Sequence, residues 1–204
     1  MISGFTITDI IIIIVSLLVS ISVHESVHAY VGLTLGDTTA SEEGRISLNP
    51  LRHIDPFATL ILPLITLILF KFPILAARPV PFNPSRVKFA EFGAALIAVA
   101  GPLSNLVLAI IGAVLVHLFL ADSSIVYALE IFVQLNVLLF IFNLIPIPPL
   151  DGSRVLYAFA PEPVQQIMSQ IEPFGIIVIF GLVLLGGFGG LLINIDNFVL
   201  RYLL

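Results

Sequence analysis

The residues of this chain that are best suited to chemistry lie in the stretch His24-Glu25-Ser26-Val27-His28, near the end of the first long apolar segment. If this segment is helical, the i, i+4 spacing places both imidazoles on one face, about one turn apart. Two imidazoles in this arrangement bind a zinc ion, and the neighbouring carboxylate of Glu25 can act as a general base. The pattern therefore predicts a hydrolase with His24 and His28 as zinc ligands, Glu25 as the catalytic base and zinc-activated water as the nucleophile.

A catalytic zinc ion needs a third protein ligand and an open position for water. The chain has no cysteine, so this ligand must be a histidine, an aspartate or a glutamate. Asp151 is the best candidate, because it follows a proline-rich stretch at the end of an apolar segment and precedes Gly152. A carboxylate at this place could instead cap the following helix. We expect one Zn²⁺ per chain, held by His24, His28 and Asp151.

The composition indicates a membrane protein. Of the 204 residues 59% are hydrophobic and only 10% are charged, whereas a soluble domain has roughly 25% charged residues. Residues 7–34 form an apolar segment long enough to span a bilayer with some tilt. Two histidines and a glutamate are expensive in such a segment and are rarely incidental there. No basic stripe suited to nucleic acid is present, so we expect lipid and not nucleic acid as a partner.

Further apolar segments predict the fold class. Residues 92–120 and 125–145 are long enough to span the membrane, and residues 173–200 form a last, glycine-rich span with a broken tail. Residues 57–70 are too short for a full span and favour a re-entrant segment. We expect an all-α polytopic membrane protein with about four transmembrane helices, this re-entrant or short apolar segment, and a small β-hairpin-like loop around residues 44–48. Residues 1–204 would form a single membrane-embedded domain.

Three motifs stand in order along the chain: His24-Glu25-x-x-His28, Ala100-Gly101-Pro102-Leu103-Ser104-Asn105 and Asn143-x-x-Pro146-x-Pro148-x-Leu150-Asp151-Gly152. Together they resemble the site-2 protease family of intramembrane zinc metalloproteases. The resemblance implies zinc held by His24, His28 and Asp151, catalysis by Glu25, and transmembrane segments of other proteins as substrates. Two departures are the lack of a PDZ domain, which many relatives have, and the additional apolar segment 57–70.

The membrane orientation follows from the need for His28 and Asp151 to meet at one depth. If the first helix runs from outside to inside, both lie near the cytoplasmic face, and the loop 71–91 lies there too. Most Lys and Arg residues would then be cytoplasmic, as the positive-inside rule favours. This arrangement requires residues 57–76 to be re-entrant. We therefore expect a multi-pass protein of the cell membrane with its active site toward the cytoplasm.

A protease of this kind must bind its substrate in an extended form, because a transmembrane helix hides its peptide groups in internal hydrogen bonds. Strand addition to an exposed edge would achieve this. Two stretches could offer such an edge, the loop 44–56 and residues 143–150, where prolines favour extended backbone. Asn143 could bind the substrate backbone or the developing oxyanion, or it could satisfy the end of its own helix.

Three other polar residues have less direct interpretations. Asn105 is expected to be a polar clasp between helices. His53 is expected to lie in a loop at the interface, with a role beside the site only if that loop folds inward. His117 would lie near the outer face, away from any metal.

A metal-ion transporter is the alternative function, because it too places histidines and acids inside a membrane. It would normally show several ligand sets along a path and repeated halves, whereas this sequence shows one compact set beside a glutamate. The GxxxG pattern at residues 186–190 fits helix packing within the chain or a homo-oligomer.

Overall fold

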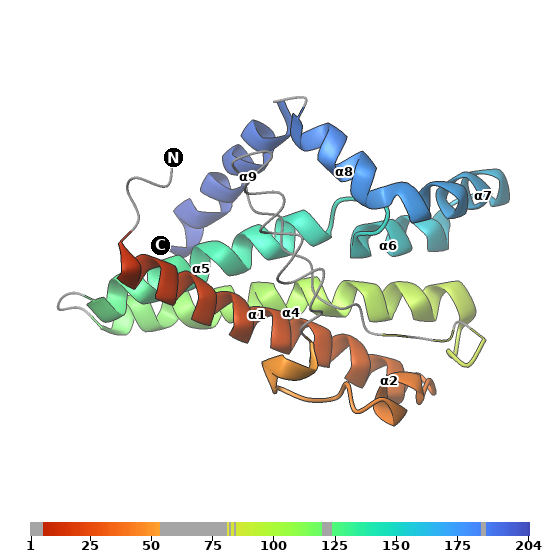
Figure 1. The fold of residues 1–204 in the computed structure, drawn as a ribbon, viewed down its shortest axis with the longest axis horizontal. Coiled ribbons are helices and arrows are strands. Elements are labelled where there is room, and N and C mark those ends of the chain that lie inside the picture. The colour runs from red at the N-terminus through yellow and green to blue at the C-terminus, as the bar shows by residue number, and fades with distance from the viewer. Residues whose placement is uncertain (1–5, 54–80, 82, 84, 120–123, 185–186) are drawn as a thin grey trace.

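The computed structural model describes residues 6–53, 81, 83, 85–119, 124–184 and 187–204, and these form helices, turns and loops without any strand (Figure 1). Three helices are long and apolar enough to cross a membrane: α1 (Ile7–Thr34), α4 (Ala90–Leu118) and α5 (Ser124–Asn143). They correspond to three of the expected spans. The chain is an all-α membrane protein over the part that the structure describes.

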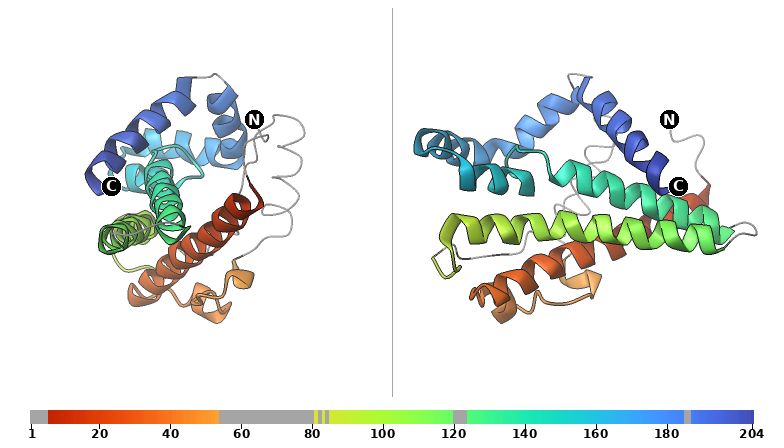
Figure 2. Two further views of the ribbon diagram at one scale, coloured as in Figure 1. Left: turned by 90° about the vertical axis from the view of Figure 1, so that its left-hand side faces the viewer. Right: turned by 180° about the vertical axis from the view of Figure 1, so that it is seen from behind.

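The three long helices pack as a bundle. α1 and α5 run in the same direction and α4 runs in the opposite one, with α4 packed against both (Figures 1 and 2). Small side chains allow the close approach of α4 and α5, where Ala109 and Ala113 meet Val133 and Val137. Because α1 and α5 are parallel, the end of α1 and the end of α5 lie at the same side of the bundle.

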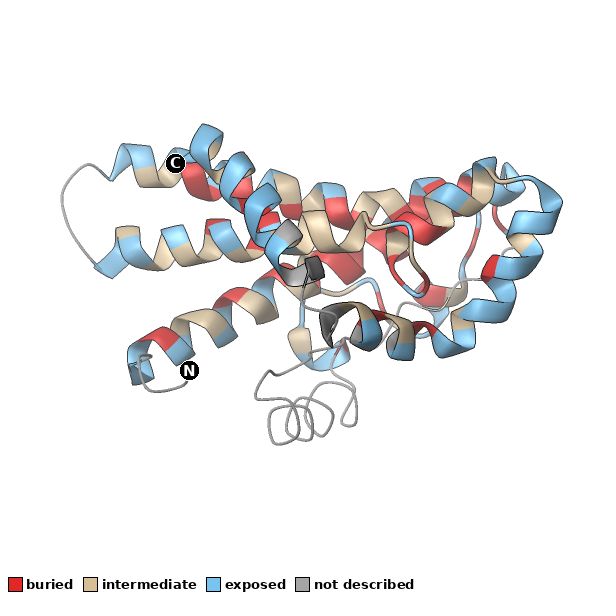
Figure 3. Ribbon diagram, turned by 90° about the horizontal axis from the view of Figure 1, so that it is seen from above, coloured by how far each residue is buried: buried red, intermediate tan, exposed pale blue. Residues whose placement is uncertain are grey.

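The interior of the bundle holds polar side chains as well as apolar ones, whereas its outer surface is largely apolar. Along α1 the buried positions include Ser16, Ser20 and His24, whereas Ile10 and Ile11 are about half exposed. Figure 3 shows the buried positions where the helices face one another. This is the distribution expected of a membrane protein, in which apolar side chains face lipid and polar groups face the interior.

Local signals define both ends of α1. The Thr6 side chain accepts a hydrogen bond from the backbone of Asp9, and the Asp9 carboxylate accepts one from the backbone of Thr6. This reciprocal pair is a capping box, which satisfies two free amide groups at the helix start. The helix ends before Gly36, which has a φ of +100°, a conformation that glycine adopts without steric cost.

The β-hairpin predicted around residues 44–48 is wrong. These residues form a turn and an irregular segment between the short helices α2 (Thr39–Glu42) and η1 (Pro50–Arg52). The segment is held instead by the side chain of Ser26, which donates a hydrogen bond of 2.5 Å to the carbonyl of Ser47. Contact with α1 therefore takes the place of pairing between two strands.

The extended backbone predicted for residues 143–150 is also wrong. After α5 the chain makes a series of turns, in which the amide of Ile147 bonds the carbonyl of Ile145 and the amide of Leu150 bonds that of Ile147. The Pro148–Pro149 peptide bond is cis. Two amphipathic helices follow, α6 (Asp151–Phe159) and α7 (Glu162–Ile171).

The predicted fourth span is not confirmed. After the short helix η3 (Glu172–Phe174), the last apolar stretch forms two helices, α8 (Gly175–Leu184) and α9 (Gly187–Leu203), which differ in direction (Figures 1 and 2). α9 packs against α5. The apolar segment 57–70, with its predicted re-entrant path through residue 76, lies outside the described residues.

Candidate metal centre

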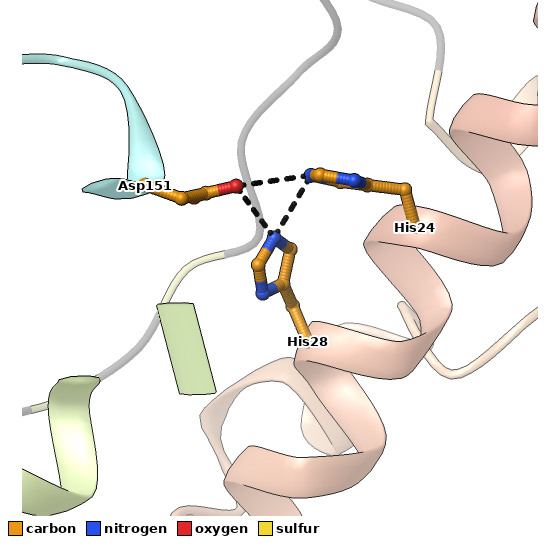
Figure 4. Close-up of side chains that lie close together, drawn as sticks. All are labelled: His24, His28 and Asp151. Carbon is orange, nitrogen blue, oxygen red and sulfur yellow. Dashed lines mark hydrogen bonds and ion pairs between the residues drawn. The ribbon is translucent and has the colours of Figure 1, made fainter. Parts of the chain in front are cut away.

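Two helices bring together His24, His28 and Asp151. The histidines come from α1 and the aspartate is the first residue of α6 (Figure 4). The two Nε2 atoms are 3.0 Å apart. Asp151 Oδ2 lies 3.2 Å from Nε2 of His24 and 3.3 Å from Nε2 of His28. Three possible ligand atoms from positions distant in the sequence therefore form a nearly equilateral triangle.

The Asp151 side chain points toward the two histidines and does not cap its own helix. The cap position of α6 is Leu150, and no side chain makes a capping hydrogen bond there. The next residue, Gly152, lies so close to the preceding turn that a β-carbon would stand 2.2 Å from the carbonyl oxygen of Leu144. The glycine thus lets the start of α6 press against the end of the α5 connection, which directs Asp151 toward α1.

The hydrogen bonds of the histidines leave their Nε2 atoms free to bind a metal. His28 Nδ1 lies 2.7 Å from the carbonyl oxygen of Ile97. A carbonyl oxygen can only accept, so Nδ1 carries the proton and Nε2 carries the lone pair. His24 Nδ1 lies 2.7 Å from Oδ1 of Asn105. Hydrogen-bond acceptors on the ring nitrogen that does not bind the metal commonly orient metal-binding histidines.

The triangle fits a tetrahedral metal ion. Three lone-pair atoms at this separation repel one another unless a cation lies between them, and Oδ2 of Asp151 is buried without a hydrogen-bond partner. Ligand atoms at 2.0–2.1 Å from a tetrahedral zinc ion are about 3.3 Å from one another. The distances of 3.0, 3.2 and 3.3 Å between these atoms are close to that value. His24, His28 and Asp151 could therefore form a metal site.

Asp151 is held in the ionised form that a ligand requires. Burial raises the pKa of its carboxyl, but the interactions that His24 and His28 make with it when they are protonated lower it more, and the net pKa is well below the usual range. A carboxylate must be deprotonated to bind a metal. The surroundings of Asp151 thus favour its negative charge before any cation is considered.

Glu25 is buried beside the triangle. It is 8% exposed, and it lies close enough to His24, His28 and Asp151 for their charges to interact. A carboxylate in this position is suited to exchange protons with a group at the metal site. The structure therefore places the predicted base next to the predicted ligands.

Asn143 is not brought into the triangle. It is the last residue of α5, and its side-chain amide donates a 3.0 Å hydrogen bond to the carbonyl of Leu139 in the same helix. His117 lies at the far end of α4 and bonds the carbonyl of Ala113.

His53 is buried because its loop folds inward. Its Nε2 lies 2.6 Å from the carbonyl oxygen of Ser47 and 3.5 Å from Oγ of Ser26. The loop therefore reaches the motif helix, at the residue that follows Glu25, but His53 is not one of the three grouped ligand atoms.

Three groups that help to position the side chains of the candidate metal site were not identified from the sequence. The Ile97 carbonyl carries no sequence signal, since any residue supplies one. Gly101 had been read only as part of a motif, yet it leaves the space in which both imidazoles lie. Asn136, a fully buried polar residue in an apolar helix, could have been found, because such residues are expensive in a membrane and tend to have a function.

Comparisons with known proteins show the family of this chain. Residues 118–186 match Peptidase family M50. A Bacillus subtilis (strain 168) protein named "Putative zinc metalloprotease YwhC" is 40% identical over 159 residues, which cover 74% of this chain and 69% of that protein. A Mycolicibacterium smegmatis protein named "Putative zinc metalloprotease Rip2" is 28% identical over 160 residues, which cover 74% of this chain and 58% of that protein. No solved structure matches this chain. The chain belongs to peptidase family M50, the site-2 protease family.

Proposed function

We propose that this protein is an intramembrane zinc metalloprotease that hydrolyses peptide bonds within or near transmembrane segments of other proteins. The observation that carries the proposal is the triangle of His24, His28 and Asp151, which lies beside Glu25 in a bundle of apolar helices. Membership of family M50 supports the same chemistry, because two relatives are named zinc metalloproteases. A site inside the bundle suits a substrate that reaches it from the bilayer.

In this proposal His24, His28 and Asp151 would hold one zinc ion, which would supply Lewis-acid polarisation of the scissile carbonyl and lower the pKa of water. Glu25 accepts the proton of the attacking water and delivers it to the amine that leaves. Its burial among charged neighbours keeps the carboxylate next to the reacting groups and away from bulk water. This function needs no further titratable group.

Asn143 is proposed to contact the substrate backbone or the oxyanion. One N–H of its amide binds the carbonyl of Leu139. An asparagine amide has a second N–H and a carbonyl oxygen, which would bind the donor and acceptor groups of an extended peptide. Asn143 stands at the end of α5, a few residues before Asp151, so a substrate held there would lie near the metal site.

We further propose that the site lies toward the cytoplasmic side of the cell membrane. The motif lies in the C-terminal half of α1, and the basic residues Arg86 and Lys88 precede the start of α4 at the same end of the bundle. Arg154 lies on α6, also at this end. The positive-inside rule favours the cytoplasm for these charges.

The test is Glu25→Gln in the full-length protein, reconstituted in liposomes with a reporter that has one transmembrane helix. Cleavage should fall about 10²–10⁴-fold, the usual contribution of a general base, while zinc content stays at about one ion per chain. Glu43→Gln is the matched control, because Glu43 is a half-exposed loop acid, and it should cleave like the wild type. Unchanged cleavage by Glu25→Gln would refute the mechanism. Zinc uptake into the liposomes without cleavage would favour a transporter.

A further inference from the structure

We propose that Asn105 and Asn136 are positioning residues that form a directional hydrogen-bond relay, which presents the lone pair of His24 Nε2 to the metal. The inference rests on the proposed metal site. It goes beyond that site because it assigns a task to two residues on α4 and α5, neither of which touches the metal. The relay crosses all three long helices of the bundle.

The relay is continuous and fully buried. Asn136 Nδ2 donates a 2.8 Å hydrogen bond to the carbonyl of Phe132. Asn105 Nδ2 lies 3.0 Å from Asn136 Oδ1, and Asn105 Oδ1 lies 2.7 Å from His24 Nδ1. Both asparagines are 0% exposed. Three side chains from three helices are therefore joined end to end, and no water is needed to complete the chain.

The direction of the relay follows from its anchor. The backbone carbonyl of Phe132 can only accept, so Asn136 must turn its NH₂ toward it and its oxygen toward Asn105. Asn105 must then turn its own NH₂ toward Asn136, which leaves its oxygen facing His24.

A second contact favours the same orientation of the Asn105 amide. Nδ2 of Asn105 also lies 3.5 Å from the carbonyl oxygen of Ser20. Reversing either amide would place two donors or two acceptors face to face. Because the Asn105 oxygen only accepts, Nδ1 of His24 carries the proton and Nε2 carries the lone pair.

The two metal-binding histidines thus reach the same protonation pattern by different means. His28 Nδ1 donates to the backbone carbonyl of Ile97, which no side-chain substitution removes. His24 depends on a side-chain amide that could face either way, and its orientation is set mainly by the 3.0 Å contact with Asn136, with a longer contact of 3.5 Å to the Ser20 carbonyl. This difference explains why an apolar helix such as α5 carries a buried asparagine. A simple clasp between α4 and α5 would not need a fixed direction.

The experiment measures zinc affinity by competition with a chelator, in the full-length protein in detergent. Asn105→Leu should weaken zinc binding about 10–100-fold, the usual effect of losing a partner outside the ligand shell. Asn136→Leu should weaken it about 10-fold, the lower end of that range, because the Asn105 amide is kept but can reverse. His117→Leu is the matched control for zinc affinity, since His117 also bonds the carbonyl four residues before it but lies at the far end of α4, and it should bind zinc like the wild type.

The decisive comparison uses Asn105→Asp. A carboxylate has two equal acceptor oxygens and no direction to fix, so adding Asn136→Leu to Asn105→Asp should no longer weaken zinc binding. If Asn136 served only for packing, Asn136→Leu would reduce zinc affinity equally in the wild type and in Asn105→Asp. That result would refute the relay. If Asn105→Leu fails to fold, the effects of Asn136→Leu in the wild-type and Asn105→Asp backgrounds still test the relay. A wild-type protein that binds no zinc would refute the metal site itself, whereas wild-type affinity in Asn136→Leu would refute the relay alone.

Discussion

Gly101 of α4 lies against His28 of α1 so closely that a β-carbon at position 101 would stand 2.2 Å from the Nε2 atom of that histidine. The same β-carbon would lie 2.7 Å from Nε2 of His24. Real β-carbons do not approach other atoms so closely, so any side chain here would enter the space between the two imidazoles. The glycine therefore forms one wall of the candidate metal site, although it offers no side-chain ligand.

The first prediction is that Gly101→Ala abolishes zinc binding and leaves the protein folded. The added methyl group pushes apart the two Nε2 atoms, which are 3.0 Å apart, while the helix propensity of alanine favours α4 by up to about 1 kcal/mol. Zinc content and circular dichroism measure the two effects. Gly181→Ala on α8 is the control, since a β-carbon there meets nothing within 4 Å. Full zinc content in Gly101→Ala would show that the imidazoles lie elsewhere.

The second prediction concerns Asp151, whose Oδ2 has no hydrogen-bond partner in the protein. Asp151→Asn keeps the shape of the side chain and removes the charge that a divalent ligand set requires. We expect zinc content well below one ion per chain after dialysis, together with loss of cleavage. Glu25→Gln provides the contrast, because it should lose cleavage and keep zinc. If Asp151→Asn retained zinc as firmly as the wild type, another residue would have to be the third ligand.

The third prediction concerns the loop that folds onto the motif helix. Ser26→Ala removes the hydrogen bond to the carbonyl of Ser47, at a net cost of about 1 kcal/mol. The loop should then open more often, and trypsin should cut after the exposed Arg52 about 5-fold faster, as that energy implies. Thr34→Ala is the control, because Thr34 is exposed and bonds only its own helix in the structure. An unchanged rate of cutting would mean that other contacts hold the loop.

The fourth prediction concerns Asp37, which joins the end of α1 to the segment before α4. Its Oδ1 accepts hydrogen bonds from the backbone and hydroxyl of Thr39, and its Oδ2 accepts one of 2.7 Å from the backbone of Asn83. Burial raises the pKa of Asp37, but these bonds and the charge of Arg86 lower it more, so the net pKa is below the usual value. The ionised form is therefore stabilised by folding.

Asp37→Asn should lower the free energy of unfolding by about 1.5–3 kcal/mol at neutral pH, the range for hydrogen bonds to a charged group. Because the pKa of Asp37 is lower in the folded state, its stabilisation is present above the unfolded pKa of about 3.9 and disappears as the pH falls through the folded pKa. The difference between variant and wild type should thus shrink below about pH 4. Denaturation of both proteins at several pH values measures this difference in the free energy of unfolding. Glu42→Gln should change stability by less than about 1 kcal/mol, because the Glu42 carboxylate is exposed where it pairs with Arg86 and accepts a hydrogen bond from Thr38.

Local patterns determined much of the candidate site. His24 and His28 share a face because the helical period is local, and the long apolar runs define α1, α4 and α5. Asp151 could be selected because few acids lie near the end of a span, and the resemblance to a known family agreed with that choice. Local preference was misleading where it competed with packing: residues 44–48 form no hairpin, and the Ser47 carbonyl bonds Ser26 instead. Residues 144–150 form turns despite their prolines.

Sequence alone determined which chemistry can be predicted for this protein, because the candidate ligands, the candidate base and the apolar surroundings depend on residue type and short spacing. Only the tertiary structure decided how that chemistry is arranged. The Ile97 carbonyl, the Asn105–Asn136 relay and the space left by Gly101 all come from helices distant in the sequence from His24 and His28. The physical reason is that a hydrogen bond and a close approach depend on positions and directions in space, which are set when α1, α4 and α5 pack together.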